Sequence, residues 1–273
     1  MPAPPVIATD LDDPRLEAYR DISAPQALLA RGLFVAEGRL VVDRLVRGRR
    51  HLLHSLLLTE TAAGAMAATL AALDLTTPVF VVPQAVMNGV VGFNIHRGCL
   101  ALAARPAARG LEALTWPSLD RIVVAEGVNN PDNIGGLFRN AASLGAQAIV
   151  LGPGCGDPLY RKAIRTSMAA TLSLPWVATT DWPGALDLVR THGLAVIACT
   201  PADGAASLYD VALPARVAVL VGGEGDGLTA AALACADVAV RIPMHGEMDS
   251  LNVATAAAIV LSALAARGAA PAV

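Results

Sequence analysis

Beyond residue 118, short apolar runs alternate with stretches whose apolar residues recur at helical spacing. The runs predict strands at 121–126, 148–151, 176–178, 195–200, 217–221 and 238–242. The stretches between and after them predict helices at 134–144, 161–170, 184–191, 229–235 and 251–266. This alternation is typical of an α/β domain, in which helices cover both faces of a parallel sheet.

A smaller α/β domain is predicted in front of it, over residues 15–105. Its strands are expected at 34–37, 54–59, 79–82 and 97–104, and its helices at 39–46, 62–73 and 83–90. The first 14 residues hold four prolines and are interpreted as a flexible arm. The periodic pattern lapses over 106–117, which is the predicted linker to the second domain at 118–273.

The charged residues are unevenly distributed along the chain. The formal net charge is −3, but residues 1–110 hold 11 arginines against 9 acidic residues, and residues 111–273 hold 9 basic against 14 acidic ones. The densest basic run lies on the helix predicted at 39–46 and just after it: Arg39, Arg44, Arg47, Arg49 and Arg50. A solvated helix face and a phosphate-binding patch explain this run equally well.

The composition argues against several classes of protein. Aromatic residues make up 4% of the chain, so stacking of bases on many aromatic side chains is not the expected mode of nucleic-acid binding. The four cysteines are widely spaced, without a CxxC pair, which indicates neither a metal site nor a disulfide framework. No signal peptide or membrane span is recognisable, and we expect a cytoplasmic protein.

Ligands of parallel sheets bind beyond the carboxyl ends of the strands, so the loops there form the candidate site. In the first loop, at 130–141, Asp132 or Asn133 can cap the following helix, and Arg139 lies about one turn into it. An arginine at this place can hold a phosphate or carboxylate through two hydrogen bonds. An ordinary surface arginine after a capping turn explains the pattern as well.

The second loop, Val221–Gly227, holds four glycines, which expose main-chain groups to a bound ligand. Its GxGxG spacing also permits a Rossmann-type oxidoreductase or methyltransferase, but that loop belongs after the first strand of its domain, and fewer than 50 residues remain here. The third loop, at 242–253, carries Ser250 and Asn252 at the entry to the last helix, where Ser250 can serve as a purely structural N-cap.

Taken together, the three loops resemble the ordered motifs of the SpoU/TrmH branch of the SPOUT methyltransferases. The matching patterns are Asn133-x-Gly135-x-x-x-Arg139, Gly222-x-Glu224-Gly225-x-Gly227-Leu228, and Ile242-Pro-Met244 with Ser250-Leu-Asn-Val253. The resemblance runs from about residue 120 to 266 and includes the stretch Arg165-Thr-Ser-Met168. In the first half, residues 34–38 and 94–98 are similar to the ends of the ribosomal-protein-like substrate-binding domain that many members carry.

The resemblance implies a trefoil-knotted domain, S-adenosylmethionine as cofactor, and a homodimer that methylates a ribose 2′-hydroxyl of RNA without a metal. It implies that the cofactor contacts, mostly main-chain groups, fall at Thr200, Gly222, Ile242 and Leu251. It also implies that Arg139 positions the adjacent phosphate or assists removal of the hydroxyl proton. Four further motif positions would align Arg139, the RNA and the cofactor: Asn133, Glu224, Ser250 and Asn252.

Two features depart from the family pattern. Ala169 stands where related sequences often have glycine, and an acidic net charge is atypical of an RNA-binding enzyme. The basic run of the first domain would supply the missing positive field, which makes that domain the expected RNA-recognition module. The two-domain layout favours ribosomal over transfer RNA. A catalytically silent RNA-binding protein of the same fold is the alternative, and the presence of the motif residues argues against it.

Overall fold

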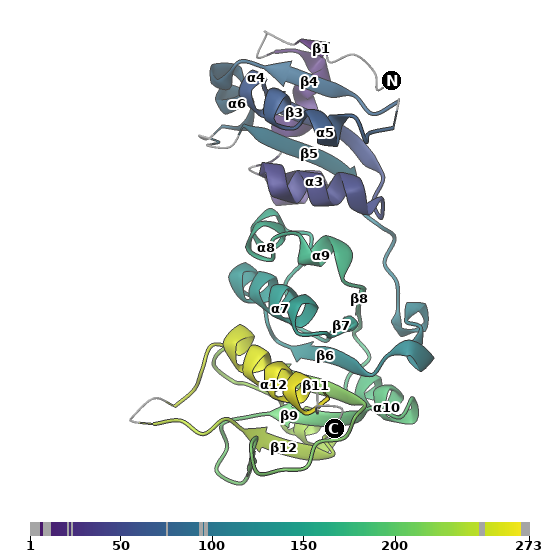
Figure 1. Ribbon diagram of the computed structural model, residues 1–273, viewed down its shortest axis with the longest axis vertical. Coiled ribbons are helices and arrows are strands. Elements are labelled where there is room, and N and C mark those ends of the chain that lie inside the picture. Colours follow the sequence, from purple (N-terminus) through teal and green to yellow (C-terminus); the bar gives the residue numbers. More distant parts are fainter. Residues whose placement is uncertain are drawn as a thin grey trace, which may run out of the picture. The chain divides into compact units, whose positions relative to one another are not determined.

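The computed structural model describes residues 6–7, 12–20, 22, 24–74, 76–92, 95, 98–245 and 249–268. The chain forms two compact units (Figure 1). Unit 1 contains the residues up to 107 together with 159–173, and unit 2 contains 108–158 and the residues from 174 onward. The segment 159–173, which the sequence pattern assigned to the second domain, therefore belongs to unit 1.

Unit 1 is built on a five-stranded mixed sheet in the order β1-β4-β3-β5-β2. The strands are β1 (Val6–Ile7), β2 (Leu33–Glu37), β3 (Leu53–Thr59), β4 (Val79–Val82) and β5 (Cys99–Ala104). Alternating strand residues such as Leu57, Leu100 and Leu102 are buried together in its apolar core. Within the predicted arm, the two residues of β1 extend the sheet by pairing with β4. Residues 94, 96 and 97 of the stretch used for the family resemblance lie outside the described residues.

In unit 1 the helices predicted at 39–46 and 83–90 are present within two residues, whereas those predicted at 62–73 and 161–170 differ from the observed helices. They are η1 (Pro14–Leu16), α1 (Glu17–Arg20), α2 (Pro25–Ala30), α3 (Arg39–Gly48), α4 (Glu60–Ala65), α5 (Ala67–Leu70), α6 (Gln84–Val91), α8 (Arg161–Thr166) and α9 (Ala170–Ser173). The helix predicted at 62–73 is divided into α4 and α5, because Met66 leaves the helical conformation with φ −109°. The helix predicted at 161–170 ends instead at Thr166.

The turn after α8 explains that second difference. Met168 and Ala169 both have positive φ, 53° and 69°. The amide of Ala169 donates to the carbonyl of Ile164 at 2.9 Å, and the amide of Met168 donates to that of Arg165 at 3.1 Å. This is the hydrogen-bond pattern of a Schellman C-cap, in which the left-handed position usually holds glycine. Two successive side-chain-bearing residues therefore adopt a conformation that is strained for them.

Unit 2 is built on a seven-stranded parallel sheet in the order β10-β12-β9-β11-β6-β7-β8. The strands are β6 (Arg121–Glu126), β7 (Ala148–Leu151), β8 (Trp176–Ala178), β9 (Ala195–Cys199), β10 (Ala206–Ser207), β11 (Val217–Gly222) and β12 (Val238–Arg241). Six of them match the predicted strands within a residue, and the short edge strand β10 had no pattern that predicted it. The expected α/β class with a parallel sheet is confirmed.

The helical elements of unit 2 are η3 (Leu111–Ala113), η4 (Trp116–Ser118), α7 (Pro131–Ser143), α10 (Gly184–Thr191), α11 (Ala230–Ala234) and α12 (Val253–Gly268). Leu186 and Val189 of α10 pack with Ala218 and Leu220 of β11 on one face of the sheet. On the other face, α12 packs against α7 and β11 (Figure 1). No helix among the described residues is both long and apolar enough to cross a membrane.

Much of the predicted linker is part of unit 2. The Trp116 ring is 6% exposed and stacks on the His192 ring, with the ring centroids 4.7 Å apart. The guanidinium of Arg216 donates to the carbonyls of Trp116 at 3.2 Å and Leu119 at 2.8 Å. The change of unit falls between residues 107 and 108. The loss of periodicity over 106–117 thus reflects two short 3-10 turns, of which Arg216 holds the second and the Trp116 ring, donating to the carbonyl of Leu111 at 3.1 Å, holds the first, rather than a free linker throughout.

Candidate active site

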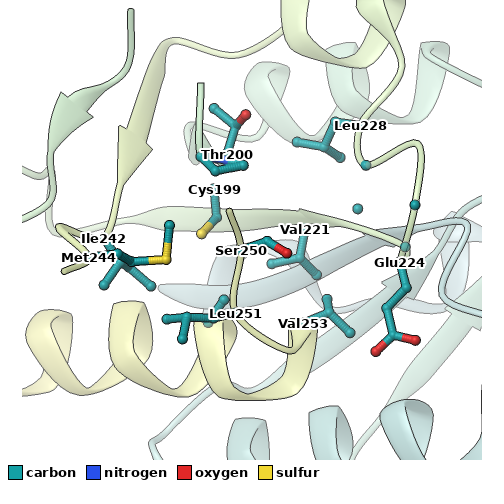
Figure 2. A pocket seen from close by; sticks show the side chains of 16 residues that line it. Cys199, Thr200, Val221, Glu224, Leu228, Ile242, Met244, Ser250, Leu251 and Val253 are labelled. Carbon is teal, nitrogen blue, oxygen red and sulfur yellow. The ribbon is translucent and has the colours of Figure 1, made fainter. Parts of the chain in front are cut away.

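A pocket of about 200 Å³ opens at the carboxyl ends of β9, β11 and β12 in unit 2. These strands are neighbours in a parallel sheet, so the loops that follow them meet at one edge. Figure 2 shows Ile242 and Met244 on one side of the pocket and Glu224 on the other. The pocket is lined by Cys199, Thr200, Pro201, Val221, Gly222, Gly223, Glu224, Gly225, Gly227, Leu228, Ile242, Met244, Ser250, Leu251, Val253 and Ala256.

All four predicted cofactor contacts line this pocket: Thr200, Gly222, Ile242 and Leu251. They come from four different stretches of chain that only the sheet order brings together. Thr200 is held there because its amide donates to the carbonyl of Val240 in β12 at 3.0 Å. The side chains of the pocket are mainly apolar, and the glycine loop contributes main-chain groups. This surface suits a ligand with a flat apolar part and a polar part recognised by the main chain.

Two glycines of the second loop are required by the fold itself. A Cβ on Gly222 would come within 2.3 Å of the Gly227 carbonyl carbon, and one on Gly223 within 2.1 Å of the Gly127 carbonyl oxygen. Both contacts are with main chain, which has little freedom to move away. The sequence pattern explained these glycines by ligand access alone. The structure adds that they let the loop fold back on itself and lie against the end of β6.

Asn252 connects all three motif loops. Its Nδ2 donates to Asn133 Oδ1 at 2.7 Å and to Glu224 Oε1 at 3.3 Å. Its Oδ1 accepts from the amides of Ala254 at 3.0 Å and Thr255 at 3.3 Å, which caps α12. Because the oxygen must face these amides, the NH₂ group must face Asn133 and Glu224. The cap therefore sets the direction of the side-chain network.

The capping residues differ from those expected. Asn130, not Asp132 or Asn133, caps α7 by accepting from the amide of Asp132 at 2.9 Å. Asn133 lies inside the helix, 7% exposed, and its oxygen is used by Asn252. At the last helix the cap is Asn252 rather than Ser250. In both cases the asparagine directly before the first helical residue reaches the free amides, and at α12 this leaves Ser250 to line the pocket.

Arg139 is exposed on the outer side of α7 and makes no hydrogen bond or ion pair within the described part of the chain. Its neighbour Asn140 donates to the carbonyl of Ala254, so Arg139 lies beside the contact between α7 and the start of α12. The structure thus brings Asn133, Glu224 and Asn252 into one network and places Ser250 in the pocket wall. It leaves the guanidinium of Arg139 directed to solvent.

The lining of the pocket carries a single charged side chain among the described residues. Glu224 is the one carboxylate among its lining residues, and neither lysine nor arginine lines it. Burial raises the pKa of the Cys199 thiol to about 11, so this sulfur is a neutral part of the wall at pH 7. No group of three or more potential metal ligands occurs among the described residues. A ligand with positive charge near Glu224 fits this distribution.

Residues 120–262 match the model of the SpoU rRNA Methylase family, which is more than half of the chain. The chain belongs to this family. An uncharacterized tRNA/rRNA methyltransferase of Mycobacterium bovis is 42% identical over 257 residues, covering 92% of this chain and 88% of the relative. The 23S rRNA (guanosine-2'-O-)-methyltransferase RlmB of Xanthomonas campestris is 33% identical over 180 residues, covering 64% of this chain and 72% of the relative.

Two solved methyltransferase structures share the fold over both units. The crystal structure of an RNA 2'-O ribose methyltransferase has a TM-score of 0.80 and 31% identity, covering 96% of this chain and 98% of the other. An AdoMet-bound rRNA methyltransferase from Sinorhizobium meliloti has a TM-score of 0.82 at 22% identity, covering 97% and 99%. The second likeness shows the fold alone. The resemblance recognised from the motifs is thereby confirmed.

One buried acid of this SpoU methylase was missed by the sequence reasoning. Glu126, the last residue of β6, is 5% exposed. Its Oε2 accepts from the amide of Thr229 at 2.9 Å and its Oε1 from the Thr229 hydroxyl at 2.8 Å. The sequence did hold a signal for this residue, because Glu126 directly follows the apolar run Ile122–Ala125 of a central strand. A charged residue at such a place is rarely buried without partners.

The basic run of unit 1 divides into two groups. Arg44 donates to the carbonyl of Met168 and Arg50 to that of Ser173, while Arg47 forms an ion pair with Asp43 at 2.8 Å. These side chains are therefore used within the unit, two of them to hold the turn after α8 and the end of α9. Arg39 and Arg49 are exposed and make no ion pair with the described residues.

Proposed function

We propose that this protein transfers a methyl group from S-adenosylmethionine to a ribose 2′-hydroxyl of RNA. The observation that carries the proposal is the pocket of unit 2, which is lined by residues of the second and third motif loops, while Asn252 joins these loops to Asn133 of the first. The names of the relatives support ribosomal RNA first, since RlmB is a 23S rRNA guanosine 2'-O-methyltransferase. Transfer RNA is the second candidate, because the Mycobacterium bovis relative is described as a tRNA/rRNA methyltransferase. We propose the cytoplasm as the place of action, where both RNA classes occur.

The residues of the pocket fit S-adenosylmethionine. Val221, Leu228 and Leu251 offer an apolar surface for an adenine ring, and the loop from Gly222 offers main-chain groups for its polar edge. Glu224 supplies the negative charge that a sulfonium and an ammonium group favour. The cofactor supplies an electrophilic methyl group, which only needs a correctly placed nucleophile. The chain must then hold the ribose and its neighbouring phosphate in line with that methyl group.

Different polar side chains are proposed to bind the RNA, to position the loops and to contact the ribose or the cofactor. Arg139 is proposed to bind the phosphate next to the target ribose or to assist removal of the hydroxyl proton, because its guanidinium is exposed on α7. Asn133, Glu224 and Asn252 are proposed to position the loops through the hydrogen bonds of Asn252. Ser250, in the wall of the pocket, is proposed to contact the ribose or the cofactor.

The experiment is a methyl-transfer assay with labelled S-adenosylmethionine. Transfer to ribosomal RNA transcripts is expected, with much less to transfer RNA, and the methylated nucleotide is then mapped. Arg139→Ala is expected to abolish transfer, whereas Arg109→Ala, at another exposed arginine of unit 2, should leave it intact. Undiminished transfer in Arg139→Ala would remove the assigned role. RNA binding without any transfer would favour the catalytically silent protein instead.

We propose that unit 1 binds the RNA through its basic run. Residues 159–173 support this, because they add Arg161, Lys162 and Arg165 to unit 1 without any acidic residue. Arg39 and Arg49 are the best test positions, since Arg44 and Arg50 also hold main-chain carbonyls. Replacing both test residues by glutamine should weaken RNA binding and reduce the salt slope by roughly 0.7 to 0.9 per lost phosphate contact. An unchanged slope would exclude both residues from the RNA interface.

We also propose a homodimer and a trefoil-knotted passage of the last segment, as the family resemblance implies. The dimer is supported by α12, which is largely apolar, with Thr255 and Ser262 as the polar residues of 253–266, although Ala258, Ile259 and Ala263 are only half-buried. A helix of this composition is normally covered over most of its surface. Sedimentation is expected to give a dimer for the wild type and a monomer for Ile259→Glu. A monomeric wild type would refute the dimer.

A further inference from the structure

Glu126 lies where it can control the glycine loop without lining the pocket. It is the last residue of β6 and pairs in register with Gly222, the last residue of β11. The loop from Gly223 to Leu228 begins directly after this pair, and five of its six residues line the pocket. The loop ends at Thr229, whose amide and hydroxyl both donate to the Glu126 carboxylate. One residue therefore lies at both ends of the loop.

The bonds at Thr229 are strongest with a carboxylate as the partner. The Thr229 hydroxyl accepts from the amide of Ala232 at 3.2 Å, as the N-cap of α11, and donates its hydrogen to one carboxylate oxygen of Glu126. The amide of Thr229 donates to the other carboxylate oxygen. Glutamine at position 126 could accept from the Thr229 amide and donate its NH₂ group to the remaining lone pair of the hydroxyl, so it replaces two charge-assisted bonds by weaker neutral ones.

At the far end of the loop this bond is the main polar anchor, beside the packing of Leu228 against the apolar core of unit 2. At the near end, Gly223 lies against the carbonyl of Gly127, and Gly223 and Gly227 form an isolated antiparallel bridge. Glu224 contacts Asn252 at 3.3 Å on the exposed side. Glu126 is the most buried residue in these contacts, at 5% exposed, although Thr229 is exposed, and hydrogen bonds to a buried charge are stronger than neutral ones.

We infer that Glu126 is a positioning residue, which holds the loop from Gly223 to Leu228 in the conformation that binds the methyl donor. This inference rests on the proposed function, because it takes the pocket to be the site of S-adenosylmethionine. Glu126 acts through Thr229 and the loop, and it does not touch the cofactor. When the bond is broken, the loop spends only part of its time in the binding conformation, and the apparent Kd rises in inverse proportion to that fraction.

The test compares Glu126→Gln and Thr229→Ala with the matched control Thr229→Ser in the full-length protein. The Kd of S-adenosylmethionine, measured by titration calorimetry, is expected to rise about tenfold or more in the first two variants and to stay unchanged in Thr229→Ser. At saturating cofactor, kcat should remain within about twofold of wild type. Hydrogen exchange should show faster exchange of the amides of residues 223–228, with β6 and β11 still protected.

A merely structural role predicts a different pattern, in which the melting temperature falls but the folded protein binds S-adenosylmethionine with the wild-type Kd. That pattern, or a wild-type Kd together with unchanged exchange of the loop, would overturn the inference. If Glu126→Gln fails to fold, Thr229→Ala carries the same comparison. Failure of the proposed function is distinguishable, because then the wild-type protein itself would not bind S-adenosylmethionine.

Discussion

Replacement of Asn252 separates two roles that this side chain combines. Asn252→Ala removes the cap of α12 and both bonds of the side-chain NH₂ group. The lost cap costs about 1 kcal/mol. The lost bond to Asn133 costs about another 1 kcal/mol, and the Asn133 oxygen, which is 7% exposed, then lacks a partner at a cost of about 1 kcal/mol more. The bond to Glu224 is longer and exposed, so it adds little. The expected loss is about 3 kcal/mol.

Asn252→Ser provides the comparison within this series. Its hydroxyl can still accept from the first free amides of α12, so the cap survives, but it is too short to reach Asn133. The expected loss is about 2 kcal/mol, which leaves about 1 kcal/mol between the two variants. Asn252→Asp also keeps the cap, yet it turns a second carboxylate toward Glu224 in place of a donor 3.3 Å away. At effective dielectric constants of 20 to 80 that repulsion is about 1 to 5 kcal/mol.

The assay is urea unfolding followed by tryptophan fluorescence. All three tryptophans of the chain, Trp116, Trp176 and Trp182, belong to unit 2, so the signal reports on the unit that contains the substitution. With an m-value of about 2 kcal/mol/M, the alanine variant should shift the midpoint by roughly 1.5 M and the serine variant by roughly 1 M. The aspartate variant should regain stability as the pH falls, because protonation removes the repulsion.

Two results would refute this reasoning. If the serine variant is as stable as the wild type, the bonds to Asn133 and Glu224 contribute nothing to the fold. If the serine and alanine variants are equally unstable, Asn252 does not act as the cap of α12. An aspartate variant whose stability does not depend on pH would show that the position is too well solvated for Glu224 to influence it.

Three further predictions concern the loop, the turn after α8 and a half-buried histidine. Gly223→Ala should weaken binding of the methyl donor at least tenfold, because the new Cβ would lie 2.1 Å from a main-chain oxygen. Gly204→Ala, whose new Cβ would have no atom within 4 Å, should leave binding unchanged. Equal effects of the two substitutions would refute the steric argument. Ala169→Gly should be more stable than Ala170→Gly by about 1 to 2 kcal/mol in thermal unfolding. Glycine at 169 relieves a φ of 69°, whereas glycine at the control position 170, in α9, only lowers the helix propensity. The reverse order of stability would count against strain at the turn. Burial lowers the pKa of His51, so below about pH 6.5 the unfolded chain binds more protons than the folded one and unit 1 should lose stability as the pH falls. This loss should be smaller in His51→Gln. Identical dependence of stability on pH in the wild type and His51→Gln would contradict this role.

The elements of unit 2 were largely predictable from local pattern. The strand at Val79–Val82 in unit 1 and the helix at Gly184–Thr191 in unit 2 agree with their predictions to the residue. Apolar runs and helical spacing are properties of neighbouring residues, and these elements bury the faces that the spacing defines. The motif loops could also be placed at the carboxyl ends of strands, since that follows from a parallel sheet. The four cofactor positions were identified by resemblance, and the pocket then brought them together.

Contacts between distant parts of the chain could not be predicted in this way. Asn252 and Asn133 are 119 residues apart, and Glu126 and Thr229 are 103 apart. No periodicity links such pairs, so both the bond from Asn252 to Asn133 and the anchor of the glycine loop were missed. The basic run shows the same limit, because Arg44 and Arg50 reach carbonyl groups more than 120 positions away.

The sequence by itself determined the secondary structure, the order of the strands along the chain and the loops that carry the chemistry. It did so because each of these depends on residues that are close in sequence. Only the tertiary structure decided which of those loops touch, which partners the Asn252 side-chain NH₂ group finds, and that residues 159–173 belong to unit 1. These features depend on hydrogen bonds and packing that exist only after the chain has folded, when donors and acceptors far apart in sequence become the nearest partners available.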